Sequence, residues 1–156
     1  MRGLLLVSLF VPIMAYSESS TSKIEDIICL AQNIYFEARN QSDLGKEAVA
    51  EVVFNRVKNK KYPNTICSVV KQAQQSFGRI IINKCQFSWY CDGRSDSPKD
   101  AKSWTASIRI AQHMINNGTR ELTQGSTHYH SVTVSPYWKE SLNKIVQIDD
   151  HIFYKE

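Results

Sequence analysis

A clear pattern of apolar and polar positions lies in residues 22–39. Apolar side chains recur three and four residues apart, the spacing of one helix face. They are Ile27, Leu30, Ala31, Ile34 and Ala38. Ser22 and Glu25 form a capping box, in which each side chain satisfies a backbone amide at a helix start. The pattern predicts a helix from Ser22 to about Arg39.

A second helix is predicted over residues 43–58, where the valines share one face and polar residues share the other. The inward positions are Val49, Val52, Val53 and Val57. The outward positions are Glu47, Glu51, Asn55 and Lys58. Tyr62-Pro63-Asn64 ends this segment, and a short third helix is expected over residues 65–72.

A fourth helix is predicted to begin at Ser97, with Pro98 in the first helical position and Asp100 completing the capping box. Its inward stripe is Trp104, Ile108, Ala111 and Ile115. Asn117-Gly118 ends it.

Two segments favour β-structure. Residues 80–82 are three consecutive isoleucines, and residues 145–154 read as a hairpin that turns at Asp149-Asp150. After the N-terminal segment the chain shows no repeat, low-complexity tract or Pro/Gly/Ser linker. The prediction is therefore a single domain of α+β class, mainly helical, with a small β element.

The N-terminus has the features of a secretory signal. Arg2 precedes an apolar run from Gly3 to Ala15, and small residues stand at Ala15 and Ser17. The run is shorter than the ~20 residues that span a bilayer, so we expect no stable membrane insertion after cleavage. The predicted organisation is a signal peptide at residues 1–17 and a secreted or periplasmic domain at residues 18–156.

Export changes how the four cysteines are interpreted, because thiols pair in an oxidising compartment. Cys85 and Cys91 flank a short loop, whereas Cys29 and Cys67 each lie in a helical segment. Of the three pairings that four cysteines allow, we therefore expect Cys29 with Cys67 and Cys85 with Cys91.

The net charge of +4 is mild, and the basic residues are spread along the chain. This distribution does not favour nucleic-acid binding, although a polyanionic surface is a plausible partner. We expect a monomer.

Glu37 stands out among the acidic residues. On a helical wheel it falls about 20° from Leu30, at the border of the apolar stripe, and it lies in the last turn. Partial burial and the negative end of the helix dipole should both raise its pKa, as in a general acid. The alternative is a surface carboxylate that pairs with Arg39 or a nearby lysine.

Residues 85–91 and 125–130 mix amides, hydroxyls and aromatic rings, and Trp138 follows them. Aromatic rings stack on the apolar faces of sugars while amides and hydroxyls bond their substituents. Trp89 and Trp138 are therefore candidate sugar-binding residues, although rings in such segments can also belong to the core.

The chain also resembles the SleB-type cell wall hydrolases, which include the spore cortex-lytic enzymes. The resemblance rests on segments in the family's order: NIYFEARNQ, AVAEVVFNRVKNKKYPNTICSVV, CQFSWYCDG, GSTHYH and IDDHIFY. It implies a lysozyme-like fold and cleavage of the peptidoglycan glycan strand, with the catalytic glutamate at Glu37. It also implies that Gln86, Ser88, His128 and Tyr129 line the cleft. The chain departs from the family pattern at two places. The family often has Gly-Glu where Asn40-Gln41 stand here, and alanine where Ser126 stands.

Two-carboxylate glycosidases need a second acid, and Asp92, Asp96, Asp149 and Asp150 offer no compelling one. We therefore expect a lytic transglycosylase with Glu37 as its single acid and with no cofactor or metal. One alternative is a zinc amidase or peptidase using His113, His128, His130 and His151, although no HExxH is present. Another is a non-catalytic module that binds the cell wall.

Overall fold

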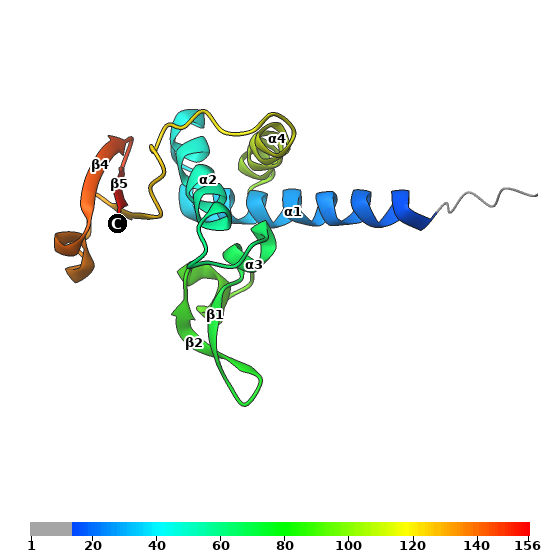
Figure 1. Cartoon of the computed structure of the whole chain (residues 1–156), viewed down its shortest axis with the longest axis horizontal. Helices are drawn as coiled ribbons and strands as arrows, with labels where there is room; N and C mark the ends of the chain where they lie inside the picture. The colour runs from blue at the N-terminus through cyan, green and yellow to red at the C-terminus, as the bar shows by residue number, and fades with distance from the viewer. Residues whose placement is uncertain (1–13) are drawn as a thin grey trace, which may run out of the picture.

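The computed structural model describes residues 14–156, and side chains from residue 20 onward. Most of the predicted signal peptide lies outside the described residues. Helix α1 (Met14–Ala38) is the longest element, and its N-terminal part projects from the body of the molecule (Figure 1). Its C-terminal part packs against α2 (Asp43–Lys58), α3 (Ile66–Val70) and α4 (Ala101–Asn117).

The main core lies where these helices meet. It contains Leu30 and Ile34 of α1, Val53 of α2, and Ile110 and Met114 of α4, all of them buried. A smaller core forms around Phe153, with Ala38, Ala48, Val49 and Val52. Because α1 contributes to both cores, its last turn is enclosed between the other helices and the C-terminal segment that carries Phe153.

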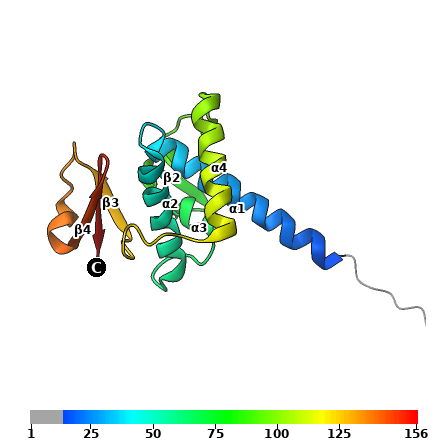
Figure 2. The same cartoon turned by 90° about the horizontal axis from the view of Figure 1, so that it is seen from above.

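Two small antiparallel sheets complete the fold. Strands β1 (Ala73–Ser76) and β2 (Arg79–Cys85) form a hairpin, and 3₁₀ helix η1 (Ser88–Cys91) follows it. The second sheet has the order β3-β5-β4, from His128–Ser131, His151–Lys155 and Asn143–Ile148, with η2 (Tyr137–Ser141) before β4. Helix α2 lies between this sheet and α4 (Figure 2).

The C-terminal hairpin is confirmed and docks on the start of α2. Asp149 adopts a left-handed conformation in the turn (φ 48°), and its Oδ2 accepts from the backbone amide of Ser42 at 2.9 Å. The same oxygen accepts from Ser42 Oγ at 2.6 Å. A Cβ on Gly45 would collide with this carboxylate, so the contact requires glycine there.

Two predicted helix starts are wrong. Helix α1 continues through Ser22 and Glu25, because no glycine or proline interrupts residues 14–25 and the capping-box sequence is also tolerated inside a helix. Helix α4 begins at Ala101, where Asp100 Oδ1 accepts from Ser103 N. The Tyr35 hydroxyl accepts from the amides of Lys99 and Asp100, both at 3.0 Å, so a contact with α1 competes with the cap expected at Ser97.

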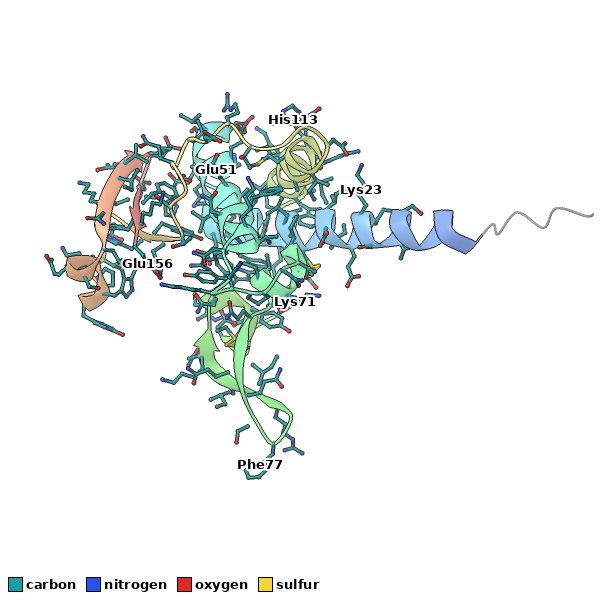
Figure 3. All side chains as sticks on the ribbon, viewed as in Figure 1. Lys23, Glu51, Lys71, Phe77, His113 and Glu156 are labelled. Atoms are coloured by element: carbon teal, nitrogen blue, oxygen red, sulfur yellow. A yellow bond between two sulfur atoms is a disulfide. The ribbon has the colours of Figure 1, made fainter. Side chains whose placement is uncertain are left out.

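The polar face of α2 also differs from expectation. Glu51, which is labelled in Figure 3, was predicted to face solvent but is only 1% exposed. Its carboxylate accepts from Leu122 N, Thr123 N and Thr123 Oγ1. The loop after α4 covers this face, and the helical period of α2 carries no sign of that loop. On α4, the buried positions are Ser107, Ile110, Ala111 and Met114, while Trp104, Ile108 and Ile115 are only partly buried.

Both predicted disulfides are present. Cys29–Cys67 joins α1 to α3, and Cys85–Cys91 joins the end of β2 to η1. Within residues 14–156, no helix is both long enough and apolar enough to cross a bilayer.

Candidate active site

Glu37 is the second-last residue of α1, half-buried where that helix meets the three-stranded sheet. Tyr129, in the middle of β3, donates its hydroxyl proton to Glu37 Oε2 at 3.0 Å. The tyrosine ring packs against His151 and Phe153 of β5, which holds the hydroxyl in place. The carboxylate is therefore fixed by two elements that lie far apart in the sequence.

A small cavity of about 170 Å³ opens at this carboxylate. Its lining comes from α1, α2, β3 and the segment between β2 and η1. The lining residues are Glu37, Arg56, Cys85, Gln86, Phe87, Ser88 and Tyr129. Among the described residues, Glu37 contributes the only carboxylate to this lining.

Burial raises the pKa of Glu37 above its ordinary value. The hydrogen bond from Tyr129 and the positive charge of Arg56 oppose this effect, since both favour the ionised form. Burial also raises the pKa of Tyr129, as does its negatively charged neighbour Glu37, so the phenol keeps its proton. The pKa of Glu37 is shifted upward, as expected from the sequence, and burial is the largest cause of the shift.

Arg56 is a cavity residue that the sequence reasoning missed. Its side chain is 5% exposed, and its guanidinium lies over the rings of Tyr62 and Phe87 at 5.2 and 5.1 Å from their centroids. Nε donates to the carbonyl of Thr127 at 2.8 Å, whereas Nη1 has no partner.

A signal for Arg56 was present in the sequence. It stands four residues after Val52 and three after Val53, on the apolar face of α2, where a charged residue is unusual.

The structure brings three of the predicted substrate-binding residues to the cavity. Gln86 and Ser88 are exposed at its rim, and Tyr129 closes it from the sheet. Trp89 lies in the core instead. It is 7% exposed, stacks on Phe36 with centroids 4.8 Å apart, and donates Nε1 to Asn33 Oδ1 at 3.2 Å.

His128 and Trp138 lie elsewhere as well. Successive side chains of a strand point to opposite faces, so His128 and His130 point away from the face that carries Tyr129. There they contact Trp138, with ring centroids 5.5 and 5.6 Å away. The neighbouring residues His128 and Tyr129, both expected in the cleft, therefore lie on opposite faces of β3.

Three of the four aspartates considered as a second acid have other contacts, and Asp96 is not among the residues that line the cavity. Asp92 Oδ1 accepts from Arg94 N at 2.8 Å, and Asp149 and Asp150 bind the Gln41-Ser42 segment before α2. Within residues 14–156, no three His, Cys, Asp or Glu side chains gather as a metal site would require. Chemically, the cavity offers one carboxyl group that holds its proton more firmly than usual, beside amide and hydroxyl groups at an open rim.

Comparison with known proteins decides the family. A family model described as Cell Wall Hydrolase matches residues 40–154. The chain belongs to the cell wall hydrolase family. Glu37 lies just before the matched residues, and Arg56, Gln86, Ser88 and Tyr129 lie within them.

Two solved relatives of this cell wall hydrolase share its fold. The catalytic domain of the Bacillus cereus SleB protein is 26% identical, with a TM-score of 0.59 over 85% of this chain and 91% of that one. The catalytic domain of the germination-specific lytic transglycosylase SleB from Bacillus anthracis is 27% identical, with a TM-score of 0.59 over 83% of this chain and 93% of that one. The α+β, mainly helical fold class is confirmed.

A curated relative is the spore cortex-lytic enzyme of Halalkalibacterium halodurans, 27% identical over 129 residues. The match covers 82% of this cell wall hydrolase but 34% of the relative, so the chain spans about a third of that protein's length.

Proposed function

We propose that this enzyme cleaves the glycan strand of peptidoglycan between N-acetylmuramic acid and N-acetylglucosamine, as a lytic transglycosylase with Glu37 as its single acid and base. The observation that carries the proposal is the cavity itself: one carboxyl group with a raised pKa and, among the described residues, no second carboxylate in the lining. The family, and a structural relative described as a lytic transglycosylase, support it.

In the first step, protonated Glu37 gives its proton to the bridging glycosidic oxygen as the bond from C1 of the muramyl residue to that oxygen breaks. The leaving sugar departs with a new hydroxyl group, and the neighbouring acetamido carbonyl stabilises the developing oxocarbenium ion. Glu37 is now a carboxylate. The hydrogen bond from Tyr129 and the charge of Arg56 favour this ionised form.

In the second step, the muramyl 6-hydroxyl attacks C1, and Glu37 accepts its proton. A 1,6-anhydro ring closes, and the acid is regenerated for the next turnover. No second carboxylate is needed, because the substrate supplies the nucleophile. If water replaced the 6-hydroxyl, the product would carry a reducing end instead.

Gln86 and Ser88 occupy the exposed rim of the cavity, where an amide and a hydroxyl can hydrogen-bond sugar substituents. We assign substrate binding to these two residues and to Tyr129, which also orients Glu37. Trp89 supports the site through the core. His128 and Trp138, on the opposite face of β3, suit a more distant part of the glycan. We place the enzyme outside the cytoplasm after removal of residues 1–17.

The product analysis is a mass spectrum of the fragments released from purified sacculi. Anhydromuramyl ends support transglycosylation, whereas reducing ends indicate hydrolysis by water. Freed stem peptides would point to an amidase or peptidase, and an absence of fragments to a module that only binds the wall.

The role of Glu37 is tested by the variant Glu37→Gln. This substitution keeps the shape of the side chain and its capacity to accept a hydrogen bond from Tyr129, but it removes the transferable proton. We expect turnover to fall by about 10² to 10⁴-fold or more, while folding and binding to sacculi persist. Glu47→Gln is the control, since Glu47 pairs with Arg120 away from the cavity. Clearance of sacculi by Glu37→Gln at a rate within a few-fold of wild type would refute the assignment.

A further inference from the structure

The β1–β2 hairpin extends away from the helices, and Phe77 lies at its far end (Figures 1 and 3). Ser76 pairs with Arg79, so Phe77 and Gly78 form a two-residue turn. The disulfide Cys85–Cys91 and the backbone bond from Gln86 N to Gln72 O, 2.9 Å long, hold the base of the hairpin. It is therefore an arm anchored at one end only.

This arm exposes its apolar side chains to solvent. Phe77 is fully exposed, and Ile80, Ile81 and Ile82 are 39%, 37% and 66% exposed. Successive strand residues point to opposite faces, so three exposed isoleucines in a row mean that neither face is covered by the rest of the chain. A two-stranded hairpin without a covered apolar face is only marginally stable in water.

The turn adds a second unusual feature. Phe77 has φ 48° and Gly78 has φ 74°, the left-handed conformations that favour Asn-Gly or Gly-Gly at these positions. A bulky aromatic residue is strained there. Because its ring is fully exposed, contacts within the chain do not offset this strain.

The charged residues of the hairpin segment itself are all basic. Lys71, Arg79 and Lys84 lie on or beside the hairpin, and residues 71–91 contain no aspartate or glutamate. All three basic residues are exposed. Glu25 of α1 shares a surface hollow with Lys71 and Ala73 at the base of the arm. An apolar tip on a segment whose own charges are all basic suits an interface that is apolar inside and anionic outside.

We propose that the β1–β2 hairpin docks on an anionic lipid surface, with Phe77 and the isoleucines entering the interface and the basic residues among the headgroups. A lipid interface can surround both faces of a slender arm, whereas a folded protein covers one face. Phe77 is the only ring between residues 73 and 85, and the isoleucines beside it do not offer the flat rings that stack on sugars, which argues against a glycan as the occupant. This function is separate from the catalytic cavity.

The first experiment reports on the hairpin tip alone. Phe77→Trp, and Tyr137→Trp as a matched control, place a tryptophan at the two most exposed aromatic positions, which are 104% and 92% exposed. Each variant is mixed with vesicles of phosphatidylglycerol and phosphatidylcholine that contain brominated chains. We expect added quenching relative to wild type for Phe77→Trp and none for Tyr137→Trp. Equal quenching in the two variants, or none in Phe77→Trp, overturns the proposal.

The second experiment measures affinity by co-sedimentation with vesicles. Wild type should bind anionic vesicles more tightly than purely phosphatidylcholine vesicles, by about fivefold for each basic residue engaged, and added salt should weaken binding. Phe77→Ser or Ile82→Ser should lower the affinity by about tenfold, while Tyr137→Ser should not. Equal affinity for both kinds of vesicle overturns the proposal.

Two further outcomes identify another occupant and also overturn it. A concentration-dependent dimer that Phe77→Ser abolishes would indicate a second copy of the chain. Retention on sacculi that Phe77→Ser abolishes, without vesicle binding by wild type, would indicate the cell wall. Phe77 is outside the cavity, so Phe77→Ser should release glycan fragments from dispersed sacculi at the wild-type rate. This result separates failure of the docking proposal from failure of the proposed activity.

Discussion

Glu37 and Arg56 are ionisable side chains of opposite charge that line one cavity without forming an ion pair. The ion pairs identified among the described residues all lie elsewhere. Burial acts in opposite directions on the two groups, raising the pKa of the carboxyl and lowering that of the guanidinium, because each loses solvation of its charged form. The attraction between the carboxylate and the guanidinium partly offsets this loss of solvation. Glu37 can therefore carry a proton at the start of a reaction and tolerate the negative charge afterward.

The raised pKa of Glu37 predicts how stability depends on pH. The unfolded side chain titrates at about 4.3. Above that pH the folded protein retains a proton that the unfolded chain has released, so this group's contribution to the free energy of unfolding falls as pH rises through the folded pKa. Each pKa unit corresponds to about 1.4 kcal/mol. Glu37→Gln lacks this loss, so its stability relative to wild type should increase between pH 4 and pH 8.

Urea unfolding at several pH values measures this difference. Glu121→Gln is the control away from the cavity, because Glu121 is exposed, and its difference from wild type should stay nearly constant. If the Glu37→Gln difference were equally constant, burial would not be raising the pKa of this carboxyl.

At the scale of elements, α2 organises the molecule through both of its faces. Its apolar face supplies Val53 to the main core and Val49 to the smaller one, and Arg56 reaches the cavity from the same face. On the other face, Glu51 holds the loop that leads from α4 to β3. Because β3 carries Tyr129, this loop helps to determine where the partner of Glu37 lies.

Glu51→Gln should destabilise the protein although the two side chains have nearly the same shape. The two carboxylate oxygens accept from Leu122 N at 3.0 Å and from Thr123 N and Oγ1 at 2.7 and 2.6 Å. An amide NH₂ in place of one oxygen faces a donor, which leaves a buried backbone amide unsatisfied. We expect a loss of about 1 to 3 kcal/mol in the free energy of unfolding.

Glu47→Gln is the matched control one turn earlier on α2. Its partner Arg120 is largely exposed, so the loss should stay below about 1 kcal/mol. Chemical denaturation of both variants compares them directly, and equal losses would contradict the structural role of Glu51.

At the scale of the whole molecule, the two disulfides have different reach. Cys29–Cys67 closes a loop between residues 38 positions apart and joins α1, the helix that carries Glu37, to α3, whereas Cys85–Cys91 spans only 6 positions. Cross-linking limits the unfolded chain more when the closed loop is longer. The first disulfide therefore holds the helical body together, and the second holds the base of the β1–β2 hairpin.

Replacing each pair with alanine tests this division. Loss of Cys29–Cys67 should lower the free energy of unfolding by about 4 kcal/mol, and loss of Cys85–Cys91 by about 2 kcal/mol. Thermal denaturation should show the larger fall in Tm for the first variant. A larger fall in Tm for the variant without Cys85–Cys91 would contradict this division of roles between the two disulfides.

Local spacing was sufficient for several features of this protein. The bounds of α2, the end of α4 at Gly118 and the C-terminal hairpin follow from neighbouring residues alone. The pairing of four cysteines followed from loop length and helical context. The position of Glu37 at the edge of an apolar stripe predicted its burial, because a helix has one period and each of its faces can be read along the chain.

Only the tertiary structure decided the features that depend on contacts between distant residues. The loop at Thr123 buries Glu51, and the hydroxyl of Tyr35 binds the amides just before α4. Arg56 reaches the cavity of Glu37 because α1, α2 and β3 converge there, and the alternation of β3 sends Tyr129 inward and His128 away. Sequence period determines which side chains share a face of one element. What that face meets depends on the packing of other elements, and this packing determined the lining of the candidate active site.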